Sequence, residues 1–313
     1  MPEFGFCTLF GLRAIIRRMI PDKLTNVDLS LLARLDRKPK LFADSGLSFW
    51  TDAYISRHVL NAHLDPTIDD ASRRPEVIQA SADWITDRAR SLTDAGTGAP
   101  LSLLDVACGP GLYCTAFADR GFSVSGIDSS ESSIGYAMQS AKKRHLPIEY
   151  RCADYRTLIE RSRYDVVTLI YGEFCVMTDR DRDRMLRKIR SALKPGGLFI
   201  FDVFTRDYSL RTALATNWYT TRDNGFWAEE PHLVLERGYT YEETDVHLNR
   251  YLVIGGAGDP IREYNIWRHH YTEQSVSELL AASGYEVCGL YGDLTGIPLE
   301  KATEWIGVVA RRT

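Results

Sequence analysis

The stretch Leu103-Leu-Asp-Val-Ala-Cys-Gly-Pro-Gly-Leu-Tyr113 decides how the rest of the chain is organised. It predicts a buried strand, a tight turn at two glycines and a helix over residues 112–119. Glycines let the backbone pass close to a ligand, and the N terminus of the helix offers unpaired N–H groups and a positive dipole end. Asp105 stands inside the strand, where a carboxylate is costly to bury without a partner. This combination indicates a site for a nucleotide-type ligand.

The composition of the 313 residues is that of an ordinary globular protein, with a formal net charge of −4. This charge argues against nucleic acid or an anionic membrane as the main partner. No apolar run reaches the roughly 20 residues that are needed to span a bilayer. Six scattered cysteines without a Cys-x-x-Cys pair favour reduced thiols over a metal site or a disulfide framework. We therefore expect a cytoplasmic protein without a metal.

The chain before the glycine turn predicts helices. Residues 1–45 are expected to form an N-terminal extension, helical or partly disordered, that includes a helix over 24–38. Residues 46–95 are expected to form a helical cap, with helices over 48–63 and 75–90.

Three rings follow one another in the first helix of this cap. Trp50, Tyr54 and His58 stand at positions i, i+4 and i+8, which places them in a single stripe. A stripe with this spacing is more often structural than part of a binding site, and both interpretations stay open.

Strands and helices alternate after the glycine turn. Apolar strands are predicted over 122–127, 148–152, 164–171, 198–204, 285–291 and 305–311. Uninterrupted apolar strands separated by helices predict a parallel sheet that is covered on both faces. Ligands of such sheets bind beyond the carboxyl ends of the strands.

The pattern changes between residues 223 and 271. Alternating runs over 233–241, 246–254 and 261–271 predict an antiparallel insertion of about three strands. The insertion carries several aromatic and histidine side chains: Phe226, Trp227, His232, Tyr239, Tyr241, His269 and His270. Alternation turns half of the strand residues away from any one face, and the sequence does not tell which half.

The dinucleotide-binding pattern Gly-x-Gly-x-x-Gly is broken here, because Cys114 stands at the third position. The opening stretch instead resembles motif I of the class I S-adenosylmethionine (SAM)-dependent methyltransferases. Four later segments, in the order that this family has them, extend the resemblance: Asp128, Cys152-Ala-Asp-Tyr155, Tyr164-Asp-Val-Val167 and Leu193-Lys-Pro-Gly-Gly-Leu-Phe-Ile-Phe-Asp202.

The resemblance implies a fold and a division of the chain. The fold is α/β, with a doubly wound, Rossmann-like sheet of seven strands, mostly parallel and with the last strand antiparallel. Residues 96–222 and 272–313 would form this SAM-binding core, and residues 223–271 would form a lid over the substrate.

The resemblance also implies which residues hold SAM and its product, S-adenosylhomocysteine (SAH). Asp128 with Ser129 would bind the ribose hydroxyls, and Asp154 with Tyr155 would bind the adenine. The remaining residues assigned to the cofactor lie at the turn, on the cap and after the fourth strand: Trp50, Tyr54, Asp105, Ala107, Gly109, Gly111 and Tyr171.

One segment before the core resembles a more specific group. Ser72-Arg-Arg-Pro-Glu76 is similar to a segment in the N-terminal cap of glycine and sarcosine-type methyltransferases, where an arginine holds the methionine carboxylate. By this likeness Arg73 is assigned to the carboxylate, with Arg74 as its rival.

Methyl transfer from SAM mainly requires alignment of the reacting atoms and exclusion of water. Glu173 follows the fourth strand and is the candidate for contacting the acceptor, as a base or as an anion that orients an amine. Tyr171 and His232 complete the predicted catalytic set.

We therefore expect a SAM-dependent methyltransferase that acts on an oxygen or nitrogen atom of a small molecule. Aminopropyl transfer from a SAM-derived donor, and a non-catalytic SAM-binding module, are the alternatives. Assembly as a homodimer is left open.

Overall fold

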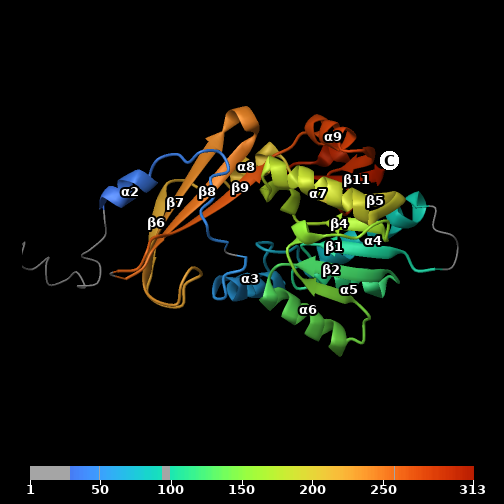
Figure 1. Cartoon of the computed structure of the whole chain (residues 1–313), viewed down its shortest axis with the longest axis horizontal. Coiled ribbons are helices and arrows are strands. Elements are labelled where there is room, and N and C mark those ends of the chain that lie inside the picture. The colour runs from blue at the N-terminus through green and yellow to red at the C-terminus, as the bar shows by residue number, and fades with distance from the viewer. Residues whose placement is uncertain (1–28, 49, 94–98, 257) are drawn as a thin grey trace, which may run out of the picture.

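Two β-sheets make up the framework of the molecule, and Figure 1 shows the four-stranded sheet on the left and the seven-stranded sheet on the right. The computed structural model describes residues 29–48, 50–93, 99–256 and 258–313. Most of the predicted N-terminal extension lies outside these residues. Of the helix predicted over 24–38, the described part is α2 (Leu29–Leu35).

The larger sheet has the strand order β10-β11-β5-β4-β1-β2-β3. Its strands are β1 (Ser102–Val106), β2 (Ser123–Asp128), β3 (Glu149–Cys152), β4 (Tyr164–Leu169), β5 (Leu193–Phe204), β10 (Tyr285–Tyr291) and β11 (Trp305–Arg312). The last strand, β11, runs antiparallel to both of its neighbours, and the remaining pairs are parallel. The predicted doubly wound α/β fold is thereby confirmed. Since β1 pairs with both β2 and β4, the winding reverses beside β1, where sheets of this kind bind ligands.

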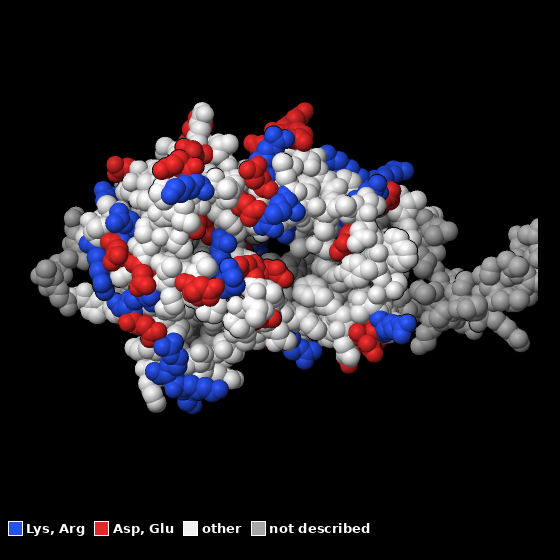
Figure 2. All heavy atoms as spheres, turned by 180° about the vertical axis from the view of Figure 1, so that it is seen from behind, with Lys and Arg blue, Asp and Glu red and all other residues white. Residues whose placement is uncertain are grey.

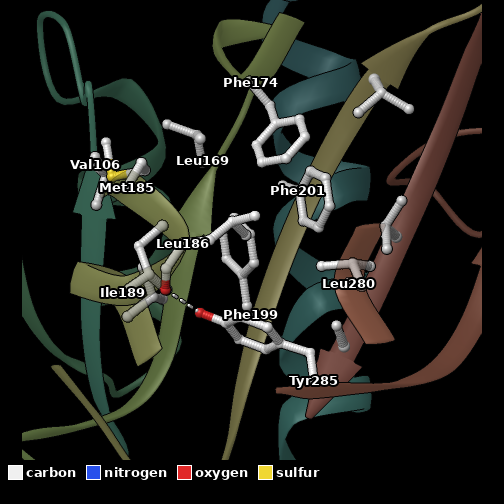
Figure 3. Packing of buried hydrophobic residues seen from close by; sticks show 14 of the residues in the cluster. Val106, Leu169, Phe174, Met185, Leu186, Ile189, Phe199, Phe201, Leu280 and Tyr285 are labelled. Carbon is white, nitrogen blue, oxygen red and sulfur yellow. Dashed lines mark hydrogen bonds between the residues drawn. The ribbon is translucent and has the colours of Figure 1, made fainter. Parts of the chain in front are cut away.

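Helices cover both faces of this sheet. One face carries α4 (Pro75–Leu92), α5 (Leu112–Asp119) and α6 (Glu131–Lys143), and the other carries α7 (Asp179–Ala192) and α9 (Glu273–Ala282). Successive residues of β5 alternate between the two cores. Phe199 and Phe201, whose ring centroids are 4.3 Å apart, point to the α7 side beside Phe174, as Figure 3 shows. In the same core the Tyr285 hydroxyl donates a 2.8 Å hydrogen bond to the carbonyl of Leu186.

The first cap helix starts later than predicted. The helix expected over 48–63 is α3 (Ile55–Leu64), so Trp50 lies before the helix. The part of the predicted stripe formed by Tyr54 and His58 is confirmed, with ring centroids 4.7 Å apart. The reason for the late start is Asp52, whose carboxylate accepts the backbone N–H groups of Tyr54 and Ile55 at 2.9 Å each and stabilises a turn before the helix. The second cap helix, α4, begins at Pro75 as predicted.

The smaller sheet is antiparallel and has the order β6-β7-β8-β9. Its strands are β6 (Asn217–Thr221), β7 (His232–Tyr241), β8 (Val246–Ile254) and β9 (Arg262–His269). The prediction of about three strands missed β6, which begins before the expected boundary at residue 223. The short elements that remain are α8 (Arg206–Arg211), η2 (Tyr155–Thr157), η3 (Glu173–Val176), η4 (Glu242–Thr244) and η5 (Leu299–Lys301).

The two faces of the four-stranded sheet have different neighbours. We call inner face the side that carries Val234, Val253, Tyr264, Ile266 and Arg268, which the strand register aligns on one side. It packs on Ile55 and Val59 of α3. The outer face carries Leu248 and Trp267 and is covered by residues 41–43.

Candidate functional site

A cavity of about 540 Å³ lies beyond the carboxyl ends of β1, β2 and β4. Its wall is built by three parts of the chain: the edge of the seven-stranded sheet, the cap around α3, and the inner face of the four-stranded sheet. The residues predicted for the site that line this cavity are Trp50, Asp105, Ala107, Gly109, Asp128, Ser129, Tyr155, Tyr171 and Glu173. Its volume is typical of small-molecule sites.

The glycine turn has an unusual backbone at the end of β1. Ala107 has φ 54°, and Gly109 and Gly111 have φ 51° and 75°, in the left-handed region that favours glycine. A Cβ on Gly109 would lie 3.4 Å from the ring of His63, so the turn and α3 approach closely. Gly111 has a different role from the predicted one, because it does not line the cavity. A Cβ there would collide with the ring and hydroxyl of Tyr150, so this glycine lets α5 pack against β3.

Asp128 ties the end of β2 to the glycine turn. One carboxylate oxygen accepts the backbone N–H of Gly109 at 2.9 Å, and the other accepts the N–H of Ser130 at 2.8 Å. Each oxygen retains a further lone pair, so the carboxylate can also accept hydroxyl groups of a ligand in the cavity. Burial raises the pKa of Asp128, and its backbone hydrogen bonds oppose that shift.

Asp105 lies almost fully buried under the same turn. Its carboxyl group accepts a 2.7 Å hydrogen bond from the Thr168 hydroxyl and a 3.5 Å contact from the Cys114 thiol. Burial raises the pKa of Asp105 to about 7, although these two hydrogen bonds lower it in part. The buried acid of the opening stretch therefore links β1 to β4 and α5 as well as reaching the cavity wall.

Glu173 and Tyr155 meet in the wall of the cavity. The Tyr155 hydroxyl donates a 3.3 Å hydrogen bond to the carboxyl group of Glu173 at the start of η3. Burial, and to a lesser extent the negative charge of Asp128, raise the pKa of Glu173 to about 8. Near neutral pH this carboxyl group can therefore hold a proton or release one, which suits proton transfer with a bound hydroxyl group.

The end of β4 is strained beside Glu173. Tyr171 has φ 76°, which is costly for a residue with a ring, and its hydroxyl hydrogen-bonds the carbonyl of Asp69 in the connection between α3 and α4. The next residue, Gly172, donates its N–H to the buried Asp202 at 2.8 Å. Its missing Cβ leaves room for the ring of Phe204, another residue of the cavity wall.

Three more of the predicted residues lie outside the cavity wall. The Tyr54 hydroxyl donates to the carbonyl of Gly225 at 2.8 Å. Asp154 caps η2 and pairs with Arg156 at 2.6 Å. Arg73 lies 3.8 Å from the ring centre of Trp305 and 3.8 Å from the carboxylate of Asp202.

His232 and Arg74, the rival of Arg73, have partners of their own. His232 is buried on β7, where its Nδ1 donates a 2.8 Å hydrogen bond to the carbonyl of Glu230. Arg74 pairs with Asp69 at 3.1 Å. Neither residue lines the cavity.

Of the aromatic and histidine residues predicted for the lid, most lie outside the cavity wall. Phe226 lines the cavity, whereas Trp227 is buried against Tyr264 with ring centres 5.0 Å apart. Tyr239 and Tyr241 lie on the outer face, where their hydroxyls donate to the carbonyls of Asp36 and Pro39. His269 pairs with Asp179, and His270 pairs with Asp245.

Several residues of the cavity wall were not predicted. They come from α3, from the N terminus of α6, from the end of β5 and the chain after it, and from β9: His58, His63, Ser130, Phe204, Tyr208, Ile266 and Arg268. Phe204 ends a predicted parallel strand and Tyr208 follows it, and these positions are a signal for them. The side chains on β9 carry no such signal, because their direction depends on register.

The surface and composition of the described residues add three observations. Lys and Arg side chains are interspersed with Asp and Glu on the face that Figure 2 shows. None of the helices that the structure describes is both long and apolar enough to cross a lipid bilayer. Among the same residues, no group of three His, Cys, Asp or Glu side chains could hold a metal ion.

The core of the chain is similar in sequence to known methyltransferases. Residues 103–197 match the family model described as a methyltransferase domain. The ubiquinone biosynthesis O-methyltransferase of Bradyrhizobium sp. (strain ORS 278) is 35% identical over 108 residues, which are 34% of this chain and 42% of that protein. The chain thus spans less than half of the length of this curated relative.

Two solved structures are similar over most of the chain. The CcbJ methyltransferase from Streptomyces caelestis superposes with a TM-score of 0.61 at 18% identity and covers 87% of this chain and 100% of its own. A SAM-dependent methyltransferase from Clostridium acetobutylicum ATCC 824 gives 0.58 at 17% identity, with 82% and 97% covered. At these identities the likeness shows a shared fold.

Proposed function

We propose that this chain is a class I, SAM-dependent methyltransferase that transfers the methyl group of SAM to a small molecule. The match of residues 103–197 to a methyltransferase domain supports this proposal, and so does a fold shared with a SAM-dependent methyltransferase. The observation that carries the proposal is the cavity beyond the carboxyl ends of β1, β2 and β4. It has Asp128 in one wall and Glu173 in another, and the glycine turn lies between their strands.

The residues of the cavity fit SAM and SAH. Asp128 has lone pairs left for the ribose hydroxyls after it accepts the two backbone N–H groups. The turn at Gly109 offers a backbone without a Cβ to the methionine part. Tyr155 offers the face of its ring to the adenine. Asp154 is left out of this assignment because its carboxylate is paired with Arg156.

Glu173 supports a hydroxyl group as the acceptor. Bound SAM supplies an activated methyl group, so the chain has to hold the nucleophile in line and exclude water. A hydroxyl group becomes a better nucleophile as it gives up its proton, and a carboxyl group with a pKa of about 8 can take that proton near neutral pH. The largely protonated Glu173 would hold a cationic amine poorly. The curated relative is named an O-methyltransferase, which agrees with an oxygen acceptor.

Titration calorimetry with SAM and SAH tests the cofactor part of the proposal. Saturable binding of both is expected, and no binding of either at millimolar concentration would overturn it. Incubation with SAM and a metabolite extract, followed by mass spectrometry, tests the transfer. A product heavier by one methylene group supports the proposal. Binding without any such product would favour a SAM-binding module. A product heavier by an aminopropyl group, formed in a parallel incubation with decarboxylated SAM, would favour the other transferase.

A further inference from the structure

Arg268 is a cation without a partner in the wall of the cavity. It is the one Lys or Arg side chain among the described residues of that wall. Its Nη1 atom is buried and makes no hydrogen bond, and none of the ion pairs within the described chain includes this side chain. Most polar groups that are buried in proteins have a partner, so this guanidinium group needs an explanation.

Four titratable side chains that lie near Arg268 are neutral near neutral pH. Burial raises the pKa of the Cys175 thiol and of the Tyr208 phenol, and it raises the pKa of Tyr251 to about 12. Burial also lowers the pKa of His247, the residue opposite Arg268 on β8. Arg268 acts on the titration of all four, and none of them is an anion near neutral pH. None of these four groups therefore supplies a negative charge to Arg268, and no carboxylate of the described residues forms an ion pair with it.

A second arginine of the same sheet shows the usual arrangement. Arg250 is buried on the outer face and pairs with Glu263 at 2.9 Å, and it also donates to the carbonyl of Arg37 at 3.1 Å. Arg73, near the cavity, has Asp202 and the ring of Trp305. Both of these arginines have carboxylate partners, and Arg268 has none. A cation in this setting costs stability unless a ligand supplies the anion.

Arg268 lies on the side of the cavity away from the proposed ribose site. Its neighbour Tyr208 follows β5, whereas Asp128 ends β2, and the sheet order places β4 and β1 between these two strands. On this side the wall also contains Val176, Phe204 and Ile266, which are apolar. If the proposed function holds, this is the side on which the methyl acceptor binds.

We propose that Arg268 binds a carboxylate group of the methyl acceptor, so that the acceptor is a small carboxylic acid with an apolar or aromatic body. The inference rests on the proposed function where it identifies the bound molecule as the methyl acceptor. The binding of a carboxylate by Arg268 does not depend on that function. One guanidinium group without a second cation matches one negative charge, which favours a carboxylate over a phosphate dianion. Its planar donors bind a carboxylate through two parallel hydrogen bonds.

Matched probes that differ in charge test this inference. Benzoate, 4-hydroxybenzoate and glycolate are titrated into the SAH-loaded protein beside their uncharged amides. The wild type is expected to bind at least one acid about 10-fold or more tightly than its amide, since a charge-assisted pair contributes that much. Arg268→Gln should abolish the preference, and Arg268→Lys should keep part of it. Arg262→Gln, on the same strand and face but outside the cavity wall, is the control and should behave as the wild type.

Thermal unfolding without ligand distinguishes a binding role from a structural one. Arg268→Gln is expected to unfold at the wild-type temperature or up to ~2 °C higher, because no ion pair is lost and an unpaired buried charge is removed. The acids should raise the unfolding temperature of the wild type and not that of the variant.

Three results would overturn the inference. They are equal binding of every acid and its amide to the wild type, a preference that survives in Arg268→Gln, and a loss of SAH affinity in Arg268→Gln, which would assign Arg268 to the cofactor. If SAH binds to neither protein, the proposed function fails instead. The acids and amides are then compared in the ligand-free proteins, and the same three variants decide whether Arg268 binds a carboxylate.

Discussion

The seven-stranded sheet contributes backbone turns and carboxyl groups to the cavity, whereas the four-stranded sheet contributes the side chains of one face. Ala107, Asp128 and Tyr171 stand at strand ends, which meet at one edge because the strands are parallel. Ile266 and Arg268 lie within β9, and the register with β8 decides that they point inward. At the carboxyl edge of a parallel sheet, the residues that follow its strands thus lie close together. On one face of an antiparallel sheet, only every second residue of each strand points toward the cavity.

This difference predicts separable effects. Changes at the edge should alter cofactor binding and proton transfer, and changes on the inner face should alter acceptor binding. Changes on the outer face should alter stability alone. Five predictions test that separation and the packing beneath it.

Glu173→Gln should have the largest effect, a loss of about 10³-fold in kcat/KM, because a general base contributes about that much. The wild-type rate should rise with pH and level off above about 8, where Glu173 has lost its proton, and the residual rate of the variant should lack this rise. Initial rates with the acceptor found by mass spectrometry measure both. An unchanged rate profile in the variant would remove Glu173 from the reaction.

Glu173 also has a consequence for stability that needs no acceptor. The folded protein holds this proton more tightly than the unfolded chain, so the contribution of Glu173 is complete below pH 4.5 and is lost as the pH rises through about 8. The unfolding temperature of the wild type should therefore fall relative to that of Glu173→Gln over this range. The exposed Glu149→Gln is the control and should show no such trend.

Trp267→Ala and Ile266→Ala compare neighbouring residues on opposite faces of β9. Trp267 is buried against Phe42, with ring centres 5.4 Å apart, so its removal should cost about 3 kcal/mol of unfolding free energy and leave KM unchanged. Ile266→Ala should cost about 1 kcal/mol and raise the acceptor KM about 5-fold. Urea unfolding and steady-state kinetics give the two quantities. Equal effects of both variants on KM would contradict the assignment of faces.

Asp128→Ala should weaken SAH binding about 100-fold, because it removes the ribose acceptor and leaves two backbone N–H groups without partners. Asp154→Ala should change the affinity by less than about 3-fold, since Asp154 lies outside the cavity wall. Calorimetry with SAH measures both variants. A larger loss of SAH affinity in Asp154→Ala than in Asp128→Ala would show that Asp154 binds the adenine after all.

Gly111→Ala should lower the unfolding free energy by about 2 kcal/mol more than Gly121→Ala does. Both glycines have positive φ, at 75° and 87°, so both variants bear the strain of the left-handed backbone. A Cβ on Gly111 also meets Tyr150, whereas nothing lies within 4 Å of one on Gly121. Denaturant unfolding gives the difference, and equal losses would show that Tyr150 moves aside without cost.

The sequence predicted the edge of the large sheet well, because strand ends and glycine turns are local signals. It predicted Asp105, Gly109, Asp128 and Glu173 for the site, and all four line the cavity. It missed Arg268, because nothing local distinguishes that residue from Trp267 or His269. The late start of α3 was also missed, since a single carboxylate at Asp52 outweighed the helical pattern.

The hydrogen bond between Tyr171 and Asp69 joins the end of β4 to the connection between α3 and α4. Residues 70–72 of that connection line the cavity, so a ligand that passes between the connection and β4 has to break this hydrogen bond. Ligands that exchange by that route would then do so at the rate at which this hydrogen bond opens. The residence time of a bound molecule would depend on the opening of the Tyr171–Asp69 hydrogen bond as well as on the contacts within the cavity.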